Sequence, residues 1–386
     1  MSLKNYISRA IEYRVIAHLQ NNDLKRAVII YGPRRSGKTY LCKYIMDALG
    51  LEPCLYVNAD EIKYVDVFSS RDRLKISSLI GGYKLVVIDE AQRIPEIGIG
   101  LKLIVDSMPG IKLLVTGSSS LWLSSSINEP LTGRKFVYNL YPFSLGELKG
   151  FFNPVEIDSF IREGALRFGM YPEVVTAAND KERTEILTEL SSSYIMRDVL
   201  EIEEIRYPNK LRRLLQLLAY QIGQLVSTTE LASSLGISRT AVERYLYLLE
   251  ESFVIFRLYG FSRNMRKEMT KMPKIYFWDL GIRNALIEDF RSIDLRNDTG
   301  QMWENFVVAE RIKYLRNSGI HTNLYFWRLQ TGAEIDIVEE RNGKLQGFEI
   351  KLKPKGRKAV LSSWKKYYPD AGYNLVTMEN FKNYVL

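Results

Sequence analysis

The chain has 386 residues, of which 46% are hydrophobic and 26% charged, and its formal net charge is +9, so we expect a globular protein of two to four domains. No apolar segment approaches the roughly 20 residues of a membrane-spanning helix, and Met1 to Asn5 lack a signal-peptide core, which excludes a membrane partner and predicts a cytoplasmic location. With only His18 and His321, a histidine metal site and a serine triad are excluded, and Cys42 and Cys54 are expected to be buried free thiols.

Five short apolar runs alternate with helical stretches through the first 140 residues. This alternation predicts a parallel α/β sheet with right-handed crossovers. The runs are Ala27 to Tyr31, Cys54 to Val57, Lys84 to Ile88, Lys112 to Thr116 and Lys135 to Leu140.

A glycine-rich turn follows the first apolar run and opens a helix. Its residues are Gly32, Pro33, Arg34, Arg35, Ser36, Gly37, Lys38 and Thr39. A strand, turn and helix of this kind direct backbone N–H groups and the positive helix end at one place, where polyphosphate oxygens bind. In such a P-loop the lysine, Lys38, reaches the β- and γ-phosphates, and the Thr39 hydroxyl is a Mg²⁺ ligand. We therefore predict an ATP and Mg²⁺ site.

Polar side chains end two later apolar runs. Asp89 and Glu90 follow the third run, and we predict that Asp89 orders the Mg²⁺ shell while Glu90 polarises the attacking water. A core strand that merely ends in acids is the alternative, but the preceding P-loop favours a nucleoside triphosphate hydrolase. Ser118, after the fourth run, is a candidate to touch the γ-phosphate or its water, with a turn or helix cap as the alternative.

Residues 145–207 are expected to be helical and to form a lid against the ATPase core. From residue 208 the pattern is typical of a winged helix-turn-helix, with helices at Leu211 to Ile222, at Thr228 to Leu235 and from Ser238 to about Glu250. The wing is expected at Phe253 to Tyr259 and Lys274 to Trp278.

The third helix and the wing of this module are candidates for binding DNA. We predict base-edge or backbone contacts from Arg239, Thr240 and Arg244. The wing loop is strongly basic, which suits a polyanion. From residue 257 to residue 274 the basic residues are Arg257, Arg263, Arg266, Lys267, Lys271 and Lys274, and the single acid is Glu268. Phosphate contacts are expected from Arg263, Arg266, Lys267 and Lys271. A module that packs against protein is the alternative.

Carboxylates gather near the C-terminus on a predicted helix and hairpin. Glu304 lies on a helix at Gly300 to Asn317, and the turn Asn342-Gly343 pairs the strands that follow. Centring the hairpin on this turn places Asp336 opposite Glu349, and Glu334 opposite Lys351, with all four side chains on one face. Opposed carboxylates are destabilising unless a cation or proton lies between them. A bulge at Gly347 would shift this register.

Together these motifs resemble, over nearly the whole chain, the AAA-type ATPases of archaea and bacteria that carry a C-terminal restriction-endonuclease-like domain. The resemblance rests on the P-loop, Asp89-Glu90-Ala91-Gln92, Thr116-Gly117-Ser118, Gly133-Arg134, Tyr141-Pro142-Phe143-Ser144, Gly169-Met170-Tyr171-Pro172-Glu173 and Tyr194-Ile195-Met196-Arg197-Asp198.

The resemblance implies roles for further residues. Arg134 or Arg197 would contact a γ-phosphate, within the subunit or across the interface of a homo-oligomer, although an ion pair of Arg197 with Asp198 is the alternative. In the C-terminal domain the acids Glu304, Asp336 and Glu349 would bind Mg²⁺, and Lys351 would orient or deprotonate the attacking water. A solvent-facing ion-pair face or a decayed nuclease kept for binding is the alternative.

The sequence thus predicts an α/β multidomain protein with a P-loop ATPase core at 1–144, a helical lid at 145–207, a winged helix at 208–282 and an α/β restriction-endonuclease-like domain at 283–386. The leading hypothesis is a Mg²⁺-dependent ATP hydrolase coupled to the binding and processing of DNA, including remodelling or cleavage of branched DNA. The alternative is a nucleotide-gated DNA-binding regulator or defence switch with an inactive nuclease-like domain.

Overall fold

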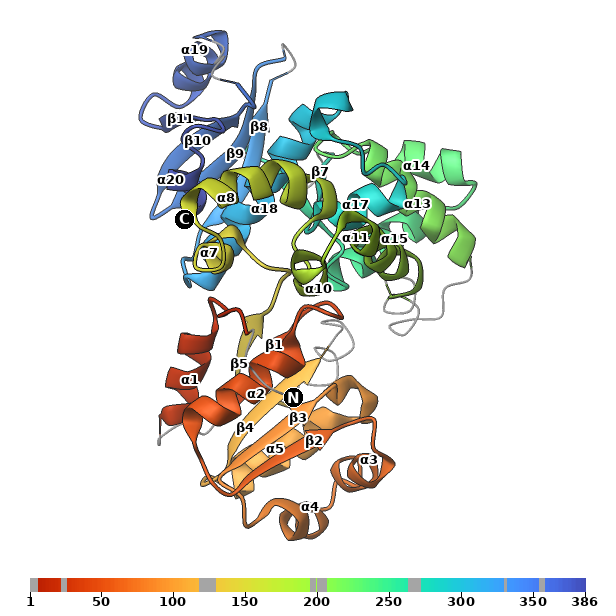
Figure 1. The fold of residues 1–386 in the computed structure, drawn as a ribbon, viewed down its shortest axis with the longest axis vertical. Coiled ribbons are helices and arrows are strands. Elements are labelled where there is room, and N and C mark those ends of the chain that lie inside the picture. The colour runs from red at the N-terminus through yellow and green to blue at the C-terminus, as the bar shows by residue number, and fades with distance from the viewer. Residues whose placement is uncertain are drawn as a thin grey trace. The chain divides into compact units, whose positions relative to one another are not determined.

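A computed structural model describes residues 6–21, 26–117, 130–194, 199, 207–262, 272–329, 332–353 and 358–386. They form two compact units, with the boundary in the chain between Pro142 and Phe143 (Figure 1). In these ranges no helix has the length and apolar character needed to cross a membrane.

The first unit is built on a parallel sheet in the strand order β2-β3-β4-β1-β5. Its strands are β1 (Ala27–Tyr31), β2 (Cys54–Asn58), β3 (Leu85–Asp89), β4 (Lys112–Gly117) and β5 (Lys135–Asn139). Each of the five predicted apolar runs forms one of these strands, so the predicted parallel sheet is confirmed. Because β4 lies between β1 and β3, the P-loop after β1 and the acids at the end of β3 flank the tip of β4.

Helices cover both faces of this sheet, as the continuous burial of β1 and β3 requires. Val28 and Ile30 face a core that includes residues of α1 and α2, and Ile29 on the other face is equally buried. The helices are α1 (Glu12–Gln20), α2 (Lys38–Leu49), α3 (Ile62–Phe68), α4 (Arg73–Ile80) and α5 (Ile97–Ser107), with a 3₁₀ turn at Ala91–Arg93. Cys42 and Cys54 are free thiols, as predicted; Cys42 is buried, whereas Cys54 is only partly buried, so the expected burial of Cys54 is wrong.

The second unit contains a six-stranded mixed sheet in the order β11-β10-β9-β8-β6-β7. Its strands are β6 (Ile255–Gly260), β7 (Lys274–Phe277), β8 (Asn323–Arg328), β9 (Glu334–Arg341), β10 (Lys344–Ile350) and β11 (Gly372–Val376). The C-terminal helices are α17 (Leu280–Leu286), α18 (Thr299–Asn317), α19 (Lys358–Tyr367) and α20 (Lys382–Val385), with a 3₁₀ turn at Ile293–Leu295.

The helices predicted as a lid belong to this second unit. They are α7 (Leu145–Leu148), α8 (Pro154–Ser159), α9 (Leu166–Phe168), α10 (Pro172–Thr176) and α11 (Asp180–Glu189), with π-helical turns at Phe160–Ala165 and Leu190–Tyr194. α9 and α11 contact α17, and the buried amide of Asn284 donates to the carbonyls of Leu166 and Arg167. These helices are therefore part of the second unit, and their packing against the ATPase core stays a prediction.

The elements of the predicted winged helix are present. The helices are α13 (Pro208–Tyr220), α14 (Thr228–Leu235) and α15 (Arg239–Glu251), and Ser238 caps α15 by accepting from the N–H of Ala241. β6 and β7 pair antiparallel, as expected of a wing, but β6 also pairs in parallel with β8. The predicted wing is thus continuous with the C-terminal sheet, and the assignment of the module as a winged helix stays a prediction.

Candidate functional site

The P-loop joins β1 to α2 through a backbone that requires glycine. A Cβ on Gly32 would lie 2.2 Å from the carbonyl oxygen of Leu140, and Gly37 has a φ of 94°. The loop curls around the ammonium of Lys38, whose Nζ donates to the carbonyl oxygens of Gly32 and Pro33 at 3.0 Å each. The loop therefore has the compact, backbone-lined shape that holds phosphate groups.

The hydroxyl of Ser36 indicates whether the P-loop fits a bound phosphate. The Oγ of Ser36 is fully buried, and among the described residues it has no hydrogen-bond partner. Buried hydroxyls are almost always paired, so this atom is consistent with a loop that completes its hydrogen bonds on a bound phosphate.

Arg9 supports the P-loop through two buried hydrogen bonds, and no motif in the sequence indicates this role. Its buried guanidinium donates to the carbonyl oxygens of Ser36 and Tyr141, both at 2.7 Å. Arg9 precedes the first helix as an isolated basic residue, which is ordinarily a surface pattern. Only the folded chain shows that it ties the P-loop to the segment after β5.

The two residues predicted to organise Mg²⁺ are in contact. The hydroxyl of Thr39 donates to Oδ2 of Asp89 over 2.6 Å, and the hydroxyl of Tyr56 donates to the same oxygen over 2.6 Å. Thr116 donates to the other carboxylate oxygen of Asp89. Burial and the hydrogen bond to Asp89 raise the pKa of Tyr56, which stays a donor. The Asp89 carboxylate is thus oriented by three hydroxyls, and it fits the oxygen-ligand chemistry of Mg²⁺.

Glu90 is held in a strained conformation beside Lys38. Its backbone has φ 57° and ψ 40°, a left-handed conformation that costs a non-glycine residue about 1 kcal/mol or more. Its N–H donates to Oγ1 of Thr116 at 3.2 Å, and its Oε2 accepts from the amide of Gln92. Its other oxygen lies 4.0 Å from Nζ of Lys38, and the side chain is 27% exposed, so water has access to it.

Arg134 lies at the other end of the sheet from the P-loop. Its carbonyl oxygen accepts from the N–H of Ala27 at 2.8 Å, at the start of β1, whereas the P-loop follows the end of β1. Four residue rises along the strand separate these ends by about 13 Å. The guanidinium bonds to Asp106 at 2.6 Å. The expectation that Arg134 contacts a γ-phosphate within its own subunit is therefore corrected. Ser118 and Arg197 lie outside the described residues.

The hairpin in the second unit has the predicted register. Lys344 pairs with Arg341, and the pairing continues without a shift to Phe348 and Ile337. Gly347 pairs regularly with Val338 and introduces no bulge. The next position along this ladder places Asp336 and Glu349 on one face, as the sequence predicted.

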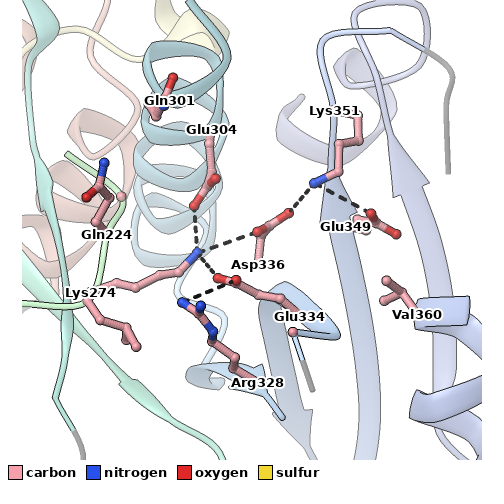
Figure 2. Close-up of a pocket in the computed structure, with 13 residues that line it drawn as sticks. Gln224, Lys274, Gln301, Glu304, Arg328, Glu334, Asp336, Glu349, Lys351 and Val360 are labelled. Atoms are coloured by element: carbon pink, nitrogen blue, oxygen red, sulfur yellow. Dashed lines mark hydrogen bonds and ion pairs between the residues drawn. The ribbon is translucent and has the colours of Figure 1, made fainter. Parts of the chain in front are cut away.

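A cavity of about 620 Å³ collects the predicted residues of the second unit, and we call it the carboxylate pocket (Figure 2). Glu304 reaches it from α18, Asp336 from β9 and Glu349 from β10. Lys351 lies 3.6 Å from Oδ2 of Asp336 and 3.5 Å from Oε1 of Glu349. The other residues that line the carboxylate pocket are Gly223, Gln224, Leu225, Lys274, Gln301, Arg328, Gly332, Glu334 and Val360.

Lys274 occupies the space between three carboxylates of this pocket. Its Nζ lies 2.9 Å from Glu304, 2.5 Å from Glu334 and 3.5 Å from Asp336. Figure 2 shows the Lys274 side chain directed at these three carboxylates. The residue is 2% exposed, so the expectation that it contributes to a basic DNA-facing wing is wrong. Burial lowers the pKa of the Lys274 ammonium, but Tyr276 and the carboxylates outweigh burial and raise this pKa well above its ordinary value. Burial also raises the pKa of Glu304.

The carboxylate pocket, as it stands, does not fit the predicted metal. In the described part of the chain no group of three or more histidine, cysteine, aspartate or glutamate side chains is arranged to hold a metal ion. The Mg²⁺ ligands expected there, Glu304, Asp336 and Glu349, lie around ammonium groups instead. Asp336 also accepts from the N–H of Ile350, and Glu349 from the hydroxyl of Tyr373. We derive no cleavage step from this arrangement.

The candidate DNA contacts fall into three groups. Arg239, Thr240 and Arg244 are exposed on α15, and Arg239 donates to the Thr228 hydroxyl at 3.1 Å. Arg257 is neutralised by Glu243 and Glu250 and does not join a basic surface. The wing residues Arg263, Arg266, Lys267 and Lys271 lie outside the described residues.

Three family models match the chain. Residues 24–149 match an AAA domain, residues 162–293 match the domain of unknown function DUF8612, and residues 299–385 match the domain of unknown function DUF4143. The first match shows that the unit containing the P-loop is an AAA-type P-loop ATPase domain.

Relatives from bacteria and archaea match most of the chain. The uncharacterized protein Rv2008c of Mycobacterium tuberculosis is 32% identical over 88% of this chain and 74% of its own length. The uncharacterized protein MJ1544 of Methanocaldococcus jannaschii is 27% identical over 86% of this chain and 74% of its own length. Among solved structures, the Walker-type ATPase PABY2304 of Pyrococcus abyssi has a TM-score of 0.49 and 17% identity, covering 74% of this chain and 97% of that one. The chain belongs to the family of the Mycobacterium tuberculosis protein Rv2008c, and carries an AAA domain followed by the DUF8612 and DUF4143 domains.

Proposed function

We propose that this protein is a Mg²⁺-dependent ATP hydrolase whose turnover is coupled to DNA. The observation that carries the proposal is the contact of Thr39 with Asp89 beside Glu90 and Lys38, at the carboxyl end of one parallel sheet. Ligands of α/β sheets bind at this end, and the AAA-domain match covers all four residues.

Each of these residues has a distinct task in hydrolysis. Thr39 and Asp89 would hold Mg²⁺, which would supply positive charge against the negative charge that develops during phosphoryl transfer. Lys38 would exchange its bonds to the carbonyls of Gly32 and Pro33 for bonds to phosphate oxygens. Glu90, fixed by its backbone and by Gln92, would orient the attacking water.

A short segment of the chain joins the unit that contains this site to the second unit. In the first unit, the N–H of Leu140 donates to the carbonyl of Tyr31 beside the P-loop. Three residues later, the carbonyl of Phe143 accepts from the buried ammonium of Lys313, and Leu145 N–H donates to Glu310. Hydrogen bonds therefore hold one end of this segment within the first unit and the other end within the second unit.

DNA is the proposed partner because of the chain's charge and the exposed residues on α15. The formal net charge of +9 favours a polyanion, and Arg239, Thr240 and Arg244 lie together on the exposed side of one helix. A homo-oligomer, in which Arg134 or Arg197 serves the site of a neighbouring subunit, is part of the same proposal.

The proposal is tested by measuring ATP turnover with and without duplex, forked, junction and single-stranded DNA at low salt. We expect Mg²⁺-dependent turnover that at least one DNA form stimulates, and Lys38→Ala should abolish turnover with every DNA. No stimulation and no binding by any DNA would overturn the coupling to DNA, whereas full turnover in Lys38→Ala would overturn the site.

A second candidate is a nucleotide-gated DNA-binding regulator or defence switch whose nuclease-like domain is inactive. The observation that favours it is the ammonium of Lys274 among the carboxylates that cleavage would require. Mg²⁺-dependent nicking, scored in the same reactions, separates the candidates. Nicking that is lost in Asp336→Ala would support the processing enzyme, and its absence from all DNA forms would support the regulator.

A further inference from the structure

Charge is nearly balanced inside the carboxylate pocket without any added ion. Its lining includes the acids Glu304, Glu334, Asp336 and Glu349 and the cations Lys274, Arg328 and Lys351. Each acid lies within 4.0 Å of at least one of these cations. The carboxylates, which would repel one another if left alone, are thus compensated by the protein's own side chains.

Lys274 is the most deeply placed of these cations. An ammonium has three N–H donors, and three carboxylates lie within 3.5 Å of its Nζ. By contrast, the side chain of Lys351 is 37% exposed and that of Arg328 is 44% exposed, whereas the side chain of Lys274 is 3% exposed. Lys274 therefore occupies the position at which the charges of the pocket converge.

The backbone fixes Lys274 in this position from both sides. Lys274 pairs with Leu258 of β6, and on its other side it bridges to Leu225. The neighbouring carbonyl of Pro273 accepts from Val226 N–H at 2.9 Å. The hydroxyl of Tyr276, two residues further along β7, donates to the same Glu304 oxygen as Lys274. The backbone of Lys274 is thus paired on both sides, and the hydrogen bonds of Lys274 and Tyr276 to Glu304 hold the ammonium in a fixed position.

We propose that the Lys274 ammonium is the resident cation of the carboxylate pocket and excludes divalent metal ions from Glu304, Glu334 and Asp336. A metal ion could share these oxygens only by approaching a fixed positive charge at close range. Removal of this charge leaves three carboxylates facing one space without a cation, and their mutual repulsion would favour closing their oxygens around a divalent ion. The inference depends neither on ATP hydrolysis nor on DNA cleavage, because it concerns metal affinity alone.

The experiment measures Mn²⁺ binding to the full chain without nucleotide, by titration calorimetry and by loss of the free Mn²⁺ electron paramagnetic resonance signal. Lys274→Gln should add one Mn²⁺ site, at least about tenfold tighter than any binding of the wild type to this pocket, because an uncompensated carboxylate cluster attracts the ion. Lys274→Arg keeps the charge and should add no site. The double variant Lys274→Gln with Glu304→Gln should lose the added site.

Two results would overturn the proposal. The first is unchanged Mn²⁺ binding in a Lys274→Gln protein whose circular dichroism matches the wild type. The second result comes from Glu304→Gln in the otherwise wild-type chain, and this test remains valid even if Lys274→Gln does not fold. The proposal predicts that Glu304→Gln leaves Mn²⁺ binding unchanged. A loss of Mn²⁺ binding in that variant would show that metal reaches the pocket despite the ammonium.

Discussion

The Nζ of Lys38 lies 4.0 Å from Oε1 of Glu90, although the two residues belong to different strand-to-helix connections. Lys38 follows β1 and Glu90 follows β3, and β4 lies between these strands. The group expected to bind phosphate and the group expected to orient water are therefore assembled in the same place. Glu90 keeps this position in a left-handed backbone conformation, which is typical of functional sites.

Glu90→Gln is expected to reduce ATP turnover by about 100-fold or more while leaving ATP binding intact, because the amide keeps the size of the side chain but is a poor base. Steady-state phosphate release and binding of a fluorescent ATP analogue measure the two quantities. Glu96→Gln is a matched control, since Glu96 also has a left-handed backbone but pairs with Arg71 at an exposed position. Equal turnover in both variants would remove Glu90 from the mechanism.

Arg9→Ala is expected to lower the free energy of unfolding of the first unit by about 2 to 4 kcal/mol, because two buried carbonyls, those of Ser36 and Tyr141, lose their donors. It should also weaken ATP binding, since Ser36 belongs to the P-loop. Chemical unfolding with and without ATP measures both effects. Arg73→Ala, at an exposed position on α4, should change stability by less than about 0.5 kcal/mol. A similar result for both variants would contradict the supporting role of Arg9.

The parts of this protein that could be predicted from sequence are those set by local rules. Buried parallel strands are continuous apolar runs, so β1 to β5 were located to within about one residue. The hairpin register followed from its turn, because Asn342 and Gly343 both adopt the positive φ that a two-residue hairpin requires. The carboxylates of the second unit were grouped correctly for the same reason.

The parts that could not be predicted depend on contacts between distant segments. Lys274 is 30 residues from Glu304 in the sequence, and a lysine that begins a strand next to a basic stretch ordinarily faces solvent. The pairing of β6 with β8 turns that position inward. The role of Tyr56 could not be predicted for the same reason. A tyrosine within an apolar strand is typical of a core residue, and only the pairing of β2 with β3 brings its hydroxyl to Asp89.

Arg244→Ala is expected to weaken DNA binding by a similar factor on every sequence and to reduce the dependence of affinity on salt by about one ion, if Arg244 contacts phosphate. Fluorescence anisotropy across a series of salt concentrations measures both quantities. Arg162→Ala, which removes an exposed arginine paired with Asp294 in the same unit, is the control. An equal loss of affinity in both variants would indicate a general charge effect and would remove α15 from the DNA-binding surface.

The buried carboxyl of Asp279 is expected to make the second unit less stable as pH rises. Burial raises the pKa of this carboxyl, and in the unfolded chain an aspartate has a pKa of about 3.9. The folded state therefore holds more protons between these two values, so the contribution of Asp279 to stability is complete below about pH 3.9 and is lost as pH rises through the folded pKa.

Asp279→Asn should remove this dependence, because asparagine does not titrate. The N–H groups of Met170 and Ile282 donate to different oxygens of Asp279, and asparagine keeps only one of these acceptors, so the variant should also lose stability by an amount that does not change with pH. The difference in unfolding free energy, wild type minus variant, should consequently fall as pH increases from about 4. Urea unfolding followed by tryptophan fluorescence measures it, since Trp278, Trp303, Trp327 and Trp364 all belong to the second unit. A difference that stays constant or grows with pH would mean that burial does not control the protonation of Asp279.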